Sequence, residues 1–193
     1  MTTGVVFVQG GGAGAHDEDR QLAGSLARCL GDDFSLDFPM MPQEDEPDYE
    51  RWRPVIARAI ARAAHPVVLV GHSVGGYLLI KYLVSEGATS PIAAVCIIAA
   101  PFPGGDPAWS IDGFELPNDF AAHLPRDAQV LLYASEDDEI VPFAHRDLYA
   151  AAIPDAITRS TSGGHQLAGD LRVVADDIRR IVAEAGMGSG EPC

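Results

Sequence analysis

Cysteine is scarce in this sequence of 193 residues, and its spacing excludes two common uses of the residue. Cys29, Cys96 and Cys193 are odd in number and widely separated, and no Cys-x-x-Cys pair occurs. Zinc sites and disulfide frameworks need closely spaced or evenly numbered cysteines. The sequence therefore predicts no metal site and no disulfide-stabilised fold, and a reducing, cytoplasmic location is the default expectation.

Basic residues and long apolar runs are also lacking. Lysine and arginine total 13 against 28 acidic residues, which gives a net charge of −15. A field of that sign repels phosphate groups, so we expect neither nucleic acid nor a membrane as a partner. No apolar run approaches the ~18 residues of a membrane-spanning helix. The run at residues 5–8 is too short for a signal peptide and follows no basic segment.

What the chain does have is the material of a packed core. Apolar residues make up 47% of the sequence. A chain of this length buries roughly 70% of its unfolded surface, which is enough to fold without a metal or a disulfide. We expect a single domain over residues 1–185, followed by a frayed, glycine-rich tail at 186–193. The sequence contains no internal repeat and predicts no particular oligomeric state.

The apolar residues alternate between two patterns along the chain. Short β-branched runs predict strands, and apolar residues three or four apart predict helices. The predicted strands cover residues 5–8, 34–38, 66–70, 92–99, 130–134 and 156–159. The predicted helices cover residues 17–30, 48–64, 75–86, 143–152 and 167–185, with a short one near 118–124. This alternation predicts an α/β fold, a mostly parallel twisted sheet with helices on both faces.

One stretch between a predicted strand and a predicted helix contains the motif Gly-x-Ser-x-Gly. The segment VVLVGHSVGGYLLIKYL, residues 67–83, places Ser73 between Gly71 and Gly75. A turn this sharp forces a strained backbone on the serine and lifts its hydroxyl clear of the sheet. Residues on either side crowd together, so glycine fits where a Cβ would not. In this context the motif predicts a nucleophile elbow, against the alternative of an ordinary Gly-Ser turn.

An acid and a histidine follow the elbow in the order that such a nucleophile requires. The segment YASEDDEIVP, residues 133–142, follows one predicted strand, and STSGGHQLAGDL, residues 160–171, follows the last. A serine hydroxyl needs a base to take its proton and an acid to orient that base. Both segments come where the carboxyl ends of parallel strands gather, beside Ser73.

With these motifs the chain resembles the α/β-hydrolase family, and in particular its small members with a minimal cap. The resemblance covers nearly the whole length: the glycine loop, the elbow, an Asp followed by Ile-Val-Pro, and a final Gly-His. It implies that Ser73 is the nucleophile, His165 the base and Asp138 the acid. Asp137, next to Asp138, is the alternative acid.

The N-terminal glycine loop admits two interpretations. In VFVQGGGAGAHDED, residues 6–19, the glycines fit a dinucleotide-binding fingerprint, with Asp37 available as a ribose ligand. The carboxylates that follow, Asp17, Glu18 and Asp19, would repel a pyrophosphate at the helix start. The resemblance favours an oxyanion hole instead, formed by the backbone N–H groups of Gly11 and Val74. Gln9 stands where the family commonly has a histidine.

The remaining histidines are predicted to have other roles. His72 is expected to be buried and neutral, packing the elbow and aimed away from Ser73. His145 is expected to face solvent from its helix. His16 is assigned to a helix start near the mouth of the site. His65, before Pro66 at a strand entrance, is expected to have a surface or structural role, and His123 precedes the acid, against the order of the family.

The resemblance implies a serine hydrolase that cleaves a small carboxylic ester or thioester through an acyl-enzyme, without metal or cofactor. The segment at residues 101–127 is too short for a closed lid, so we expect an open cleft and a small-molecule ester substrate. Its predicted apolar walls are Phe102, Trp109, Phe114 and Leu116. An acyltransferase or peptidase on the same triad, or a weakly catalytic binding module with this fold, remain as alternatives.

Overall fold

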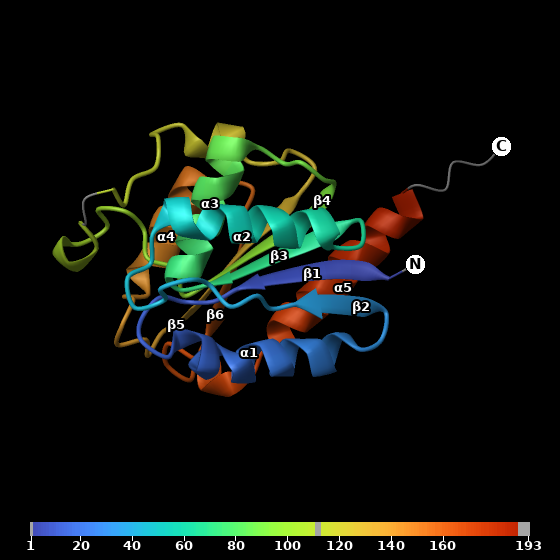
Figure 1. Cartoon of the computed structure of the whole chain (residues 1–193), viewed down its shortest axis with the longest axis horizontal. Helices are drawn as coiled ribbons and strands as arrows, with labels where there is room; N and C mark the ends of the chain where they lie inside the picture. Colours follow the sequence, from blue (N-terminus) through green and yellow to red (C-terminus); the bar gives the residue numbers. More distant parts are fainter. Residues whose placement is uncertain (1, 111–112, 189–193) are drawn as a thin grey trace.

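The computed structural model describes residues 2–110 and 113–188 and contains one six-stranded sheet (Figure 1). The strand order is β2-β1-β3-β4-β5-β6, and every pairing is parallel. The strands are β1 (Thr3–Val8), β2 (Phe34–Asp37), β3 (Val67–His72), β4 (Ile92–Ile98), β5 (Gln129–Ser135) and β6 (Ile157–Thr161). All six predicted strands are confirmed, with ends that differ from the predicted ones by at most two residues.

Helices cover both faces of the sheet, as the sequence predicts. The helices are α1 (Ala15–Leu30), α2 (Tyr49–Arg62), α3 (Val74–Glu86), α4 (Ala144–Ala152) and α5 (Arg172–Gly188). Figure 1 shows α2, α3 and α4 on one side of the sheet, whereas α1 lies on the other and packs against α5. The predicted α/β class is therefore confirmed.

The alternation of side chains along each central strand explains why both faces need cover. In β1, Val5 and Phe7 pack against α1 and α5, while Val6 and Val8 pack against α2 and α3. All four side chains are fully buried. Successive residues of a strand point to opposite faces, so an unbroken apolar run produces two cores. The sheet is thus held rigidly from both sides, with its carboxyl edge left for loops.

Two predicted boundaries are wrong at the C-terminal end. The helix predicted from residue 167 begins only at Arg172, and Leu167–Gly169 forms a separate 3₁₀ turn in which Ala168 has a φ of 51°. α5 also extends to Gly188, three residues past the predicted helix end and into the segment predicted as a tail. The rest of that predicted tail, 189–193, lies outside the described residues.

The segment after β4 carries little regular structure. Its described parts contain two short 3₁₀ helices, Pro107–Trp109 and Phe120–His123, of which the second agrees with the predicted short helix. Within residues 2–110 and 113–188, no helix is long and apolar enough to cross a membrane.

Candidate active site

The elbow lies where β3 turns into α3. Ser73 is the one residue between them, and it has a φ of 51° and a ψ of −130°. A non-glycine residue with positive φ is strained, and such strain persists only when the surroundings enforce it. The Ser73 N–H donates to the carbonyl of Ile98 at the end of β4, 2.8 Å away. This bond ties the turn to the carboxyl edge of the sheet.

The flanking glycines are required by close backbone approach. A Cβ at position 75 would collide with the carbonyl oxygens of Val8 and Gln9 at the end of β1. A Cβ at position 71 would lie 2.6 Å from Gly76 Cα. The sequence suggests that positions 71 and 75 crowd each other, but Gly75 is crowded mainly by β1. The elbow is therefore packed directly against the glycine loop.

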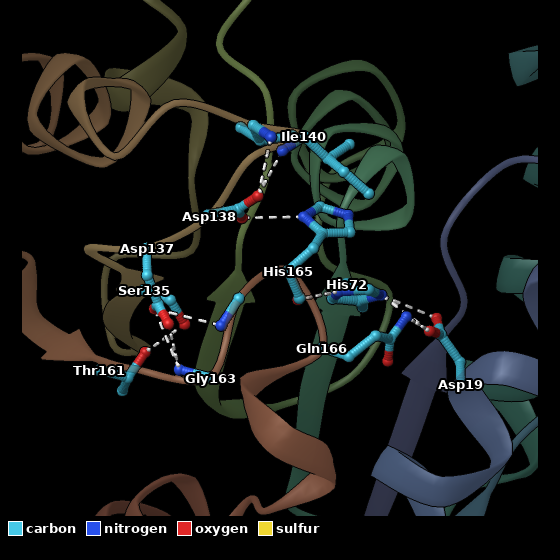
Figure 2. A network of polar contacts seen from close by, with 12 residues as sticks. Asp19, His72, Ser135, Asp137, Asp138, Ile140, Thr161, Gly163, His165 and Gln166 are labelled. Atoms are coloured by element: carbon cyan, nitrogen blue, oxygen red, sulfur yellow. Dashed lines mark hydrogen bonds and ion pairs between the residues drawn. The ribbon is translucent and has the colours of Figure 1, made fainter.

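Asp138 and His165 meet at the carboxyl ends of β5 and β6 (Figure 2). Asp138 Oδ2 lies 2.8 Å from His165 Nδ1, and the Asp138 side chain is completely buried. Its Oδ1 accepts the N–H groups of Ile140 and Val141. Burial raises the pKa of Asp138, but the bonds from His165, Val141 and Ile140 outweigh it and hold that pKa below its usual value. The carboxylate is thus ionised and fixed against one nitrogen of the ring.

Asp137, the alternative acid, contacts the backbone of the histidine loop instead. Its carboxylate accepts the N–H groups of Gly163 and Gly164 at 3.0–3.1 Å. These two bonds lower the pKa of Asp137 below its ordinary value. The two neighbouring carboxylates therefore have different partners. Asp138 contacts the His165 ring, whereas Asp137 binds the backbone of the loop that carries this histidine.

The two nitrogens of His165 have different surroundings. Its Nδ1 is taken up by Asp138, whereas Nε2 has no hydrogen-bond partner among the residues that the structure describes. No hydrogen bond joins Ser73 Oγ to His165 within the same residues. The elbow and the loop that carries His165 are joined through His72, whose Nε2 lies 3.0 Å from the His165 carbonyl oxygen.

The glycine loop leaves one of its backbone donors free beside the elbow. The Gly10 N–H donates to Asp19 Oδ2 at 2.7 Å, and the Gly12 N–H donates to the Glu44 carbonyl at 2.6 Å. Between them, the Gly11 N–H has no acceptor in the described part of the chain, and neither has the Val74 N–H at the start of α3. These are the two donors that the sequence assigns to an oxyanion hole.

The carboxylate of Glu44 lies against the N-terminus of α1. Its oxygens accept the N–H groups of Gly14 and His16 and the side-chain amide of Gln9. Asp19, one turn into α1, points inward and is 1% exposed. Protein carboxylates thus use the donors that a dinucleotide phosphate would need, which disfavours that interpretation. The role of Glu44 could not be predicted, because nothing in the sequence pattern relates it to residues some thirty positions away.

Two predictions for the other histidines need correction. His145 is 2% exposed rather than facing solvent. Its Nδ1 accepts the Phe102 N–H at 2.8 Å, and its Nε2 lies 2.9 Å from Asp106 Oδ2. The helical spacing correctly predicts that His145 lies on a helix. It does not show that residues 101–110 cover this side chain.

His72 is buried as predicted, but the prediction that it is neutral does not fit its contacts. Both of its ring nitrogens face oxygen acceptors, one on Asp19 and one on the His165 backbone. His16 lies at the start of α1 as expected, with its ring stacked on Phe38 at a centroid distance of 4.3 Å.

An apolar groove of about 530 Å³ begins at Val74, next to the elbow. Trp109 and Phe114, two of the predicted walls, line it together with Tyr49, Tyr77 and Leu78. Phe102 is not part of this groove. It packs against Phe120 and Tyr149, so it anchors the loop to the core instead of forming a wall. Leu116 likewise packs on the core.

The parallel sheet, the strained serine at the end of its third strand and the Asp–His pair on the following loops define an α/β hydrolase. A family model described as serine hydrolase matches residues 34–170, and the chain belongs to that family. No curated protein matches the sequence.

Solved structures share the fold at low sequence identity. The ydeN gene product from B. subtilis is 20% identical with a TM-score of 0.73, and the match covers 95% of this chain and 100% of that one. A CIB-like hydrolase from Thermoplasma acidophilum is 17% identical, with a TM-score of 0.66 and coverage of 92% and 86%. The esterase domain of a Rhodothermus marinus protein is 17% identical, with a TM-score of 0.64 and coverage of 93% and 87%. These likenesses concern the fold alone.

Proposed function

We propose that the protein is a serine esterase that cleaves small carboxylic esters or thioesters. Ser73 Oγ attacks the acyl carbon while His165 Nε2 takes its proton, and Asp138 holds the imidazole by Nδ1. The N–H groups of Gly11 and Val74 donate to the oxyanion. His165 then protonates the leaving alcohol, and it activates the water that hydrolyses the acyl-enzyme.

The observation that carries this proposal is the Asp138–His165 pair. A buried carboxylate 2.8 Å from Nδ1 fixes the tautomer that leaves Nε2 free to accept a proton. The pair lies on loops at the same sheet edge as Ser73, and the Ser73 backbone already has the strained conformation of a nucleophile elbow. Membership of the serine hydrolase family supports the same assignment.

The groove beside Val74 supports an apolar acyl or alcohol group as part of the substrate. Four of its lining residues are aromatic: Tyr49, Tyr77, Trp109 and Phe114. One structural relative is an esterase domain from Rhodothermus marinus, which agrees with ester chemistry. The segment at residues 101–127 is too short to form a closed lid, which agrees with a small substrate.

Labelling with a fluorophosphonate probe tests the proposed nucleophile. We expect one covalent adduct on Ser73 in the wild-type protein, located by mass spectrometry of the digest. The Ser73→Ala variant should remain folded, take up no probe and lose ester hydrolysis by on the order of 10⁴-fold or more. A wild-type protein that is not labelled, or an adduct on another residue, would contradict the proposal.

A series of p-nitrophenyl esters tests the substrate class. Each further CH₂ buried in the groove contributes about 0.8 kcal/mol, or roughly a fourfold gain in kcat/KM, while wall remains to cover it. The gain should stop after a few carbons, and no rate jump should occur at the micellar threshold. A higher kcat/KM on long-chain esters than on butyrate would sink this part of the proposal.

A further inference from the structure

A second buried carboxylate gathers three parts of the site around itself. Asp19, on α1, accepts the Gly10 N–H at 2.7 Å. It also accepts the Gln166 side-chain amide at 3.0 Å and His72 Nδ1 at 2.9 Å (Figure 2). The three donors belong to the glycine loop, to the loop of the base and to the last residue of β3. Asp19 and His72 are each 1% exposed.

The contacts determine where the protons lie. A carbonyl oxygen only accepts, so His72 Nε2 must donate to His165. Asp19 already accepts from two amides, so it is ionised and the proton between it and His72 lies on Nδ1. Burial opposes charge on both groups. The bond and charge of His72 nevertheless lower the pKa of Asp19, and those of Asp19 raise the pKa of His72.

With both nitrogens donating, His72 has no free site for a proton in transit. It can hold the His165 backbone but cannot act as a base towards a substrate. Asp19 also differs from Asp138, because within the described residues it makes no hydrogen bond to the His165 ring. Whatever this pair does for the reaction must act through the positions of its neighbours.

We propose that Asp19 and His72 form a positioning pair that sets the glycine loop and the His165 loop against the elbow. The inference rests on the proposed function of Ser73 and His165. One end of the pair fixes Gly10, next to the Gly11 donor, and the other end fixes the backbone of His165 itself. A displacement of about 1 Å at such groups costs up to 10²-fold in rate.

Stability alone does not explain why this ion pair is present. Taking two charges out of water is costly, and apolar side chains of similar size commonly stabilise such a site as well or better. What a bonded ion pair adds is direction, since each hydrogen bond fixes one neighbour at one distance. Here the fixed neighbours are a residue of the glycine loop and the base residue.

Two substitutions at position 19 separate positioning from folding. Asp19→Asn can still accept the Gly10 N–H and donate to a neutral His72, with the Gln166 amide turned over, so the geometry survives without charge. Asp19→Ala removes all three bonds. Glu18→Ala, which removes an exposed carboxylate from the same helix, is the matched control. The readouts are the rate of fluorophosphonate labelling at Ser73 per folded molecule, and the kcat and KM of ester hydrolysis.

We expect Asp19→Ala to lower the labelling rate and kcat at least tenfold with KM within about twofold of wild type. Asp19→Asn should stay within about threefold of wild type, and Glu18→Ala should equal it. If Asp19→Ala does not fold, His72→Asn replaces it, because the shorter side chain cannot span Asp19 and the His165 carbonyl. We then expect at least a fivefold loss.

The outcomes keep this inference apart from the proposed function. A wild-type protein that the probe does not label overturns the proposed function. If the wild type is labelled, and the folded Asp19→Ala or its His72→Asn replacement is labelled at the same rate, the positioning pair is wrong and Asp19 has only a structural role. An Asp19→Asn protein as slow as Asp19→Ala would also overturn the positioning pair, because the hydrogen bonds that asparagine retains would then have no effect on the rate.

Discussion

The two Asp–His pairs of the site lie side by side, with the His72 and His165 rings 4.8 Å apart, yet they are built for opposite purposes. In Asp138–His165 the carboxylate meets one ring nitrogen and the other is free of protein partners in the described residues. In Asp19–His72 both nitrogens are engaged, one by a carboxylate and one by a carbonyl. Under the proposed function, a free second ring nitrogen therefore distinguishes the base, whereas residue type and burial alone do not.

The position of each pair in the fold explains the difference. His165 lies on a loop beyond β6, where its ring can reach solvent and is 11% exposed. His72 is the last residue of β3 and is closed in by the neighbouring loops. A histidine inside the sheet can satisfy both nitrogens with protein groups, while one on an edge loop is left with a vacant position for chemistry.

The largest effect should come from breaking the Asp138–His165 pair, in which Nε2 of the histidine is free. His165→Ala should lower kcat by on the order of 10⁴-fold or more, because Ser73 loses its base. The double variant Ser73→Ala/His165→Ala should be no slower than either single variant, since nucleophile and base act as a unit. Steady-state hydrolysis of a short p-nitrophenyl ester measures both. Additive losses in the double variant would show that the two residues act separately.

The next effect separates the two neighbouring carboxylates. Asp138→Asn should reduce kcat by about 10³-fold or more, because the amide presents the wrong partner to His165 Nδ1. Asp137→Asn keeps one side-chain oxygen that can accept the N–H groups of Gly163 and Gly164, so we expect a loss below about tenfold. Comparing kcat for the two variants at neutral pH checks the assignment. A more severe loss for Asp137→Asn would transfer the role of acid to Asp137.

How far the sequence predicts this molecule depends on how local each signal is. The strands follow from β-branched runs, and the elbow from glycines that cannot carry a Cβ, so both are visible in a few residues. The order of Ser73, the acidic cluster and His165 is equally visible. The choice of Asp138 over Asp137 is harder, because it depends on which side chain the loop after β5 turns inward.

The contacts that hold the site could not be predicted, because they join residues far apart. Asp19 reaches His72 across 53 positions and Gln166 across 147, and no periodic pattern marks such a pair. An exposed helix start is the ordinary place for Asp17, Glu18 and Asp19, and only the fold shows that the third turns inward. For the same reason His145 is predicted at the surface, although Asp106 and the Phe102 N–H cover it.

A third pair, Asp106–His145, lies away from the elbow and should affect binding more than chemistry. His145 Nδ1 accepts the Phe102 N–H, and Asp106 caps the turn that carries Trp109. Asp106→Ala should therefore loosen one wall of the groove and raise KM by about threefold or more with kcat nearly unchanged. Asp127→Ala, at an exposed position away from the groove, is the control. A fall in kcat without a change in KM would count against this role.

The smallest effect concerns the charge of the buried pair, and its sign follows from the two pKa directions. The depressed pKa of Asp19 gives stability that is present above the unfolded value of about 3.9. The raised pKa of His72 gives stability that is complete below about 6.5 and is lost as the pH rises through the folded value. The titratable groups that face His72 are Asp19 from α1 and Asp138 and His165 from the loops after β5 and β6.

The thermal stability of the wild type relative to Asp19→Asn should therefore depend on pH. In Asp19→Asn, His72 has no carboxylate to hold its second proton, so this variant lacks the contribution of the ion pair, while Asp138 and His165 are common to both proteins and largely cancel in the difference. The wild-type advantage in Tm should be greatest near pH 5–6 and should narrow by about 2–4 °C by pH 8.5, the response of a chain of this size to roughly 1 kcal/mol. Thermal melts followed by circular dichroism at pH 5.5, 7 and 8.5 measure it, with Glu18→Gln as the exposed control. A difference that stays constant across this range would mean that His72 is neutral in the folded protein, and the contrast between the two pairs would then rest on geometry without charge.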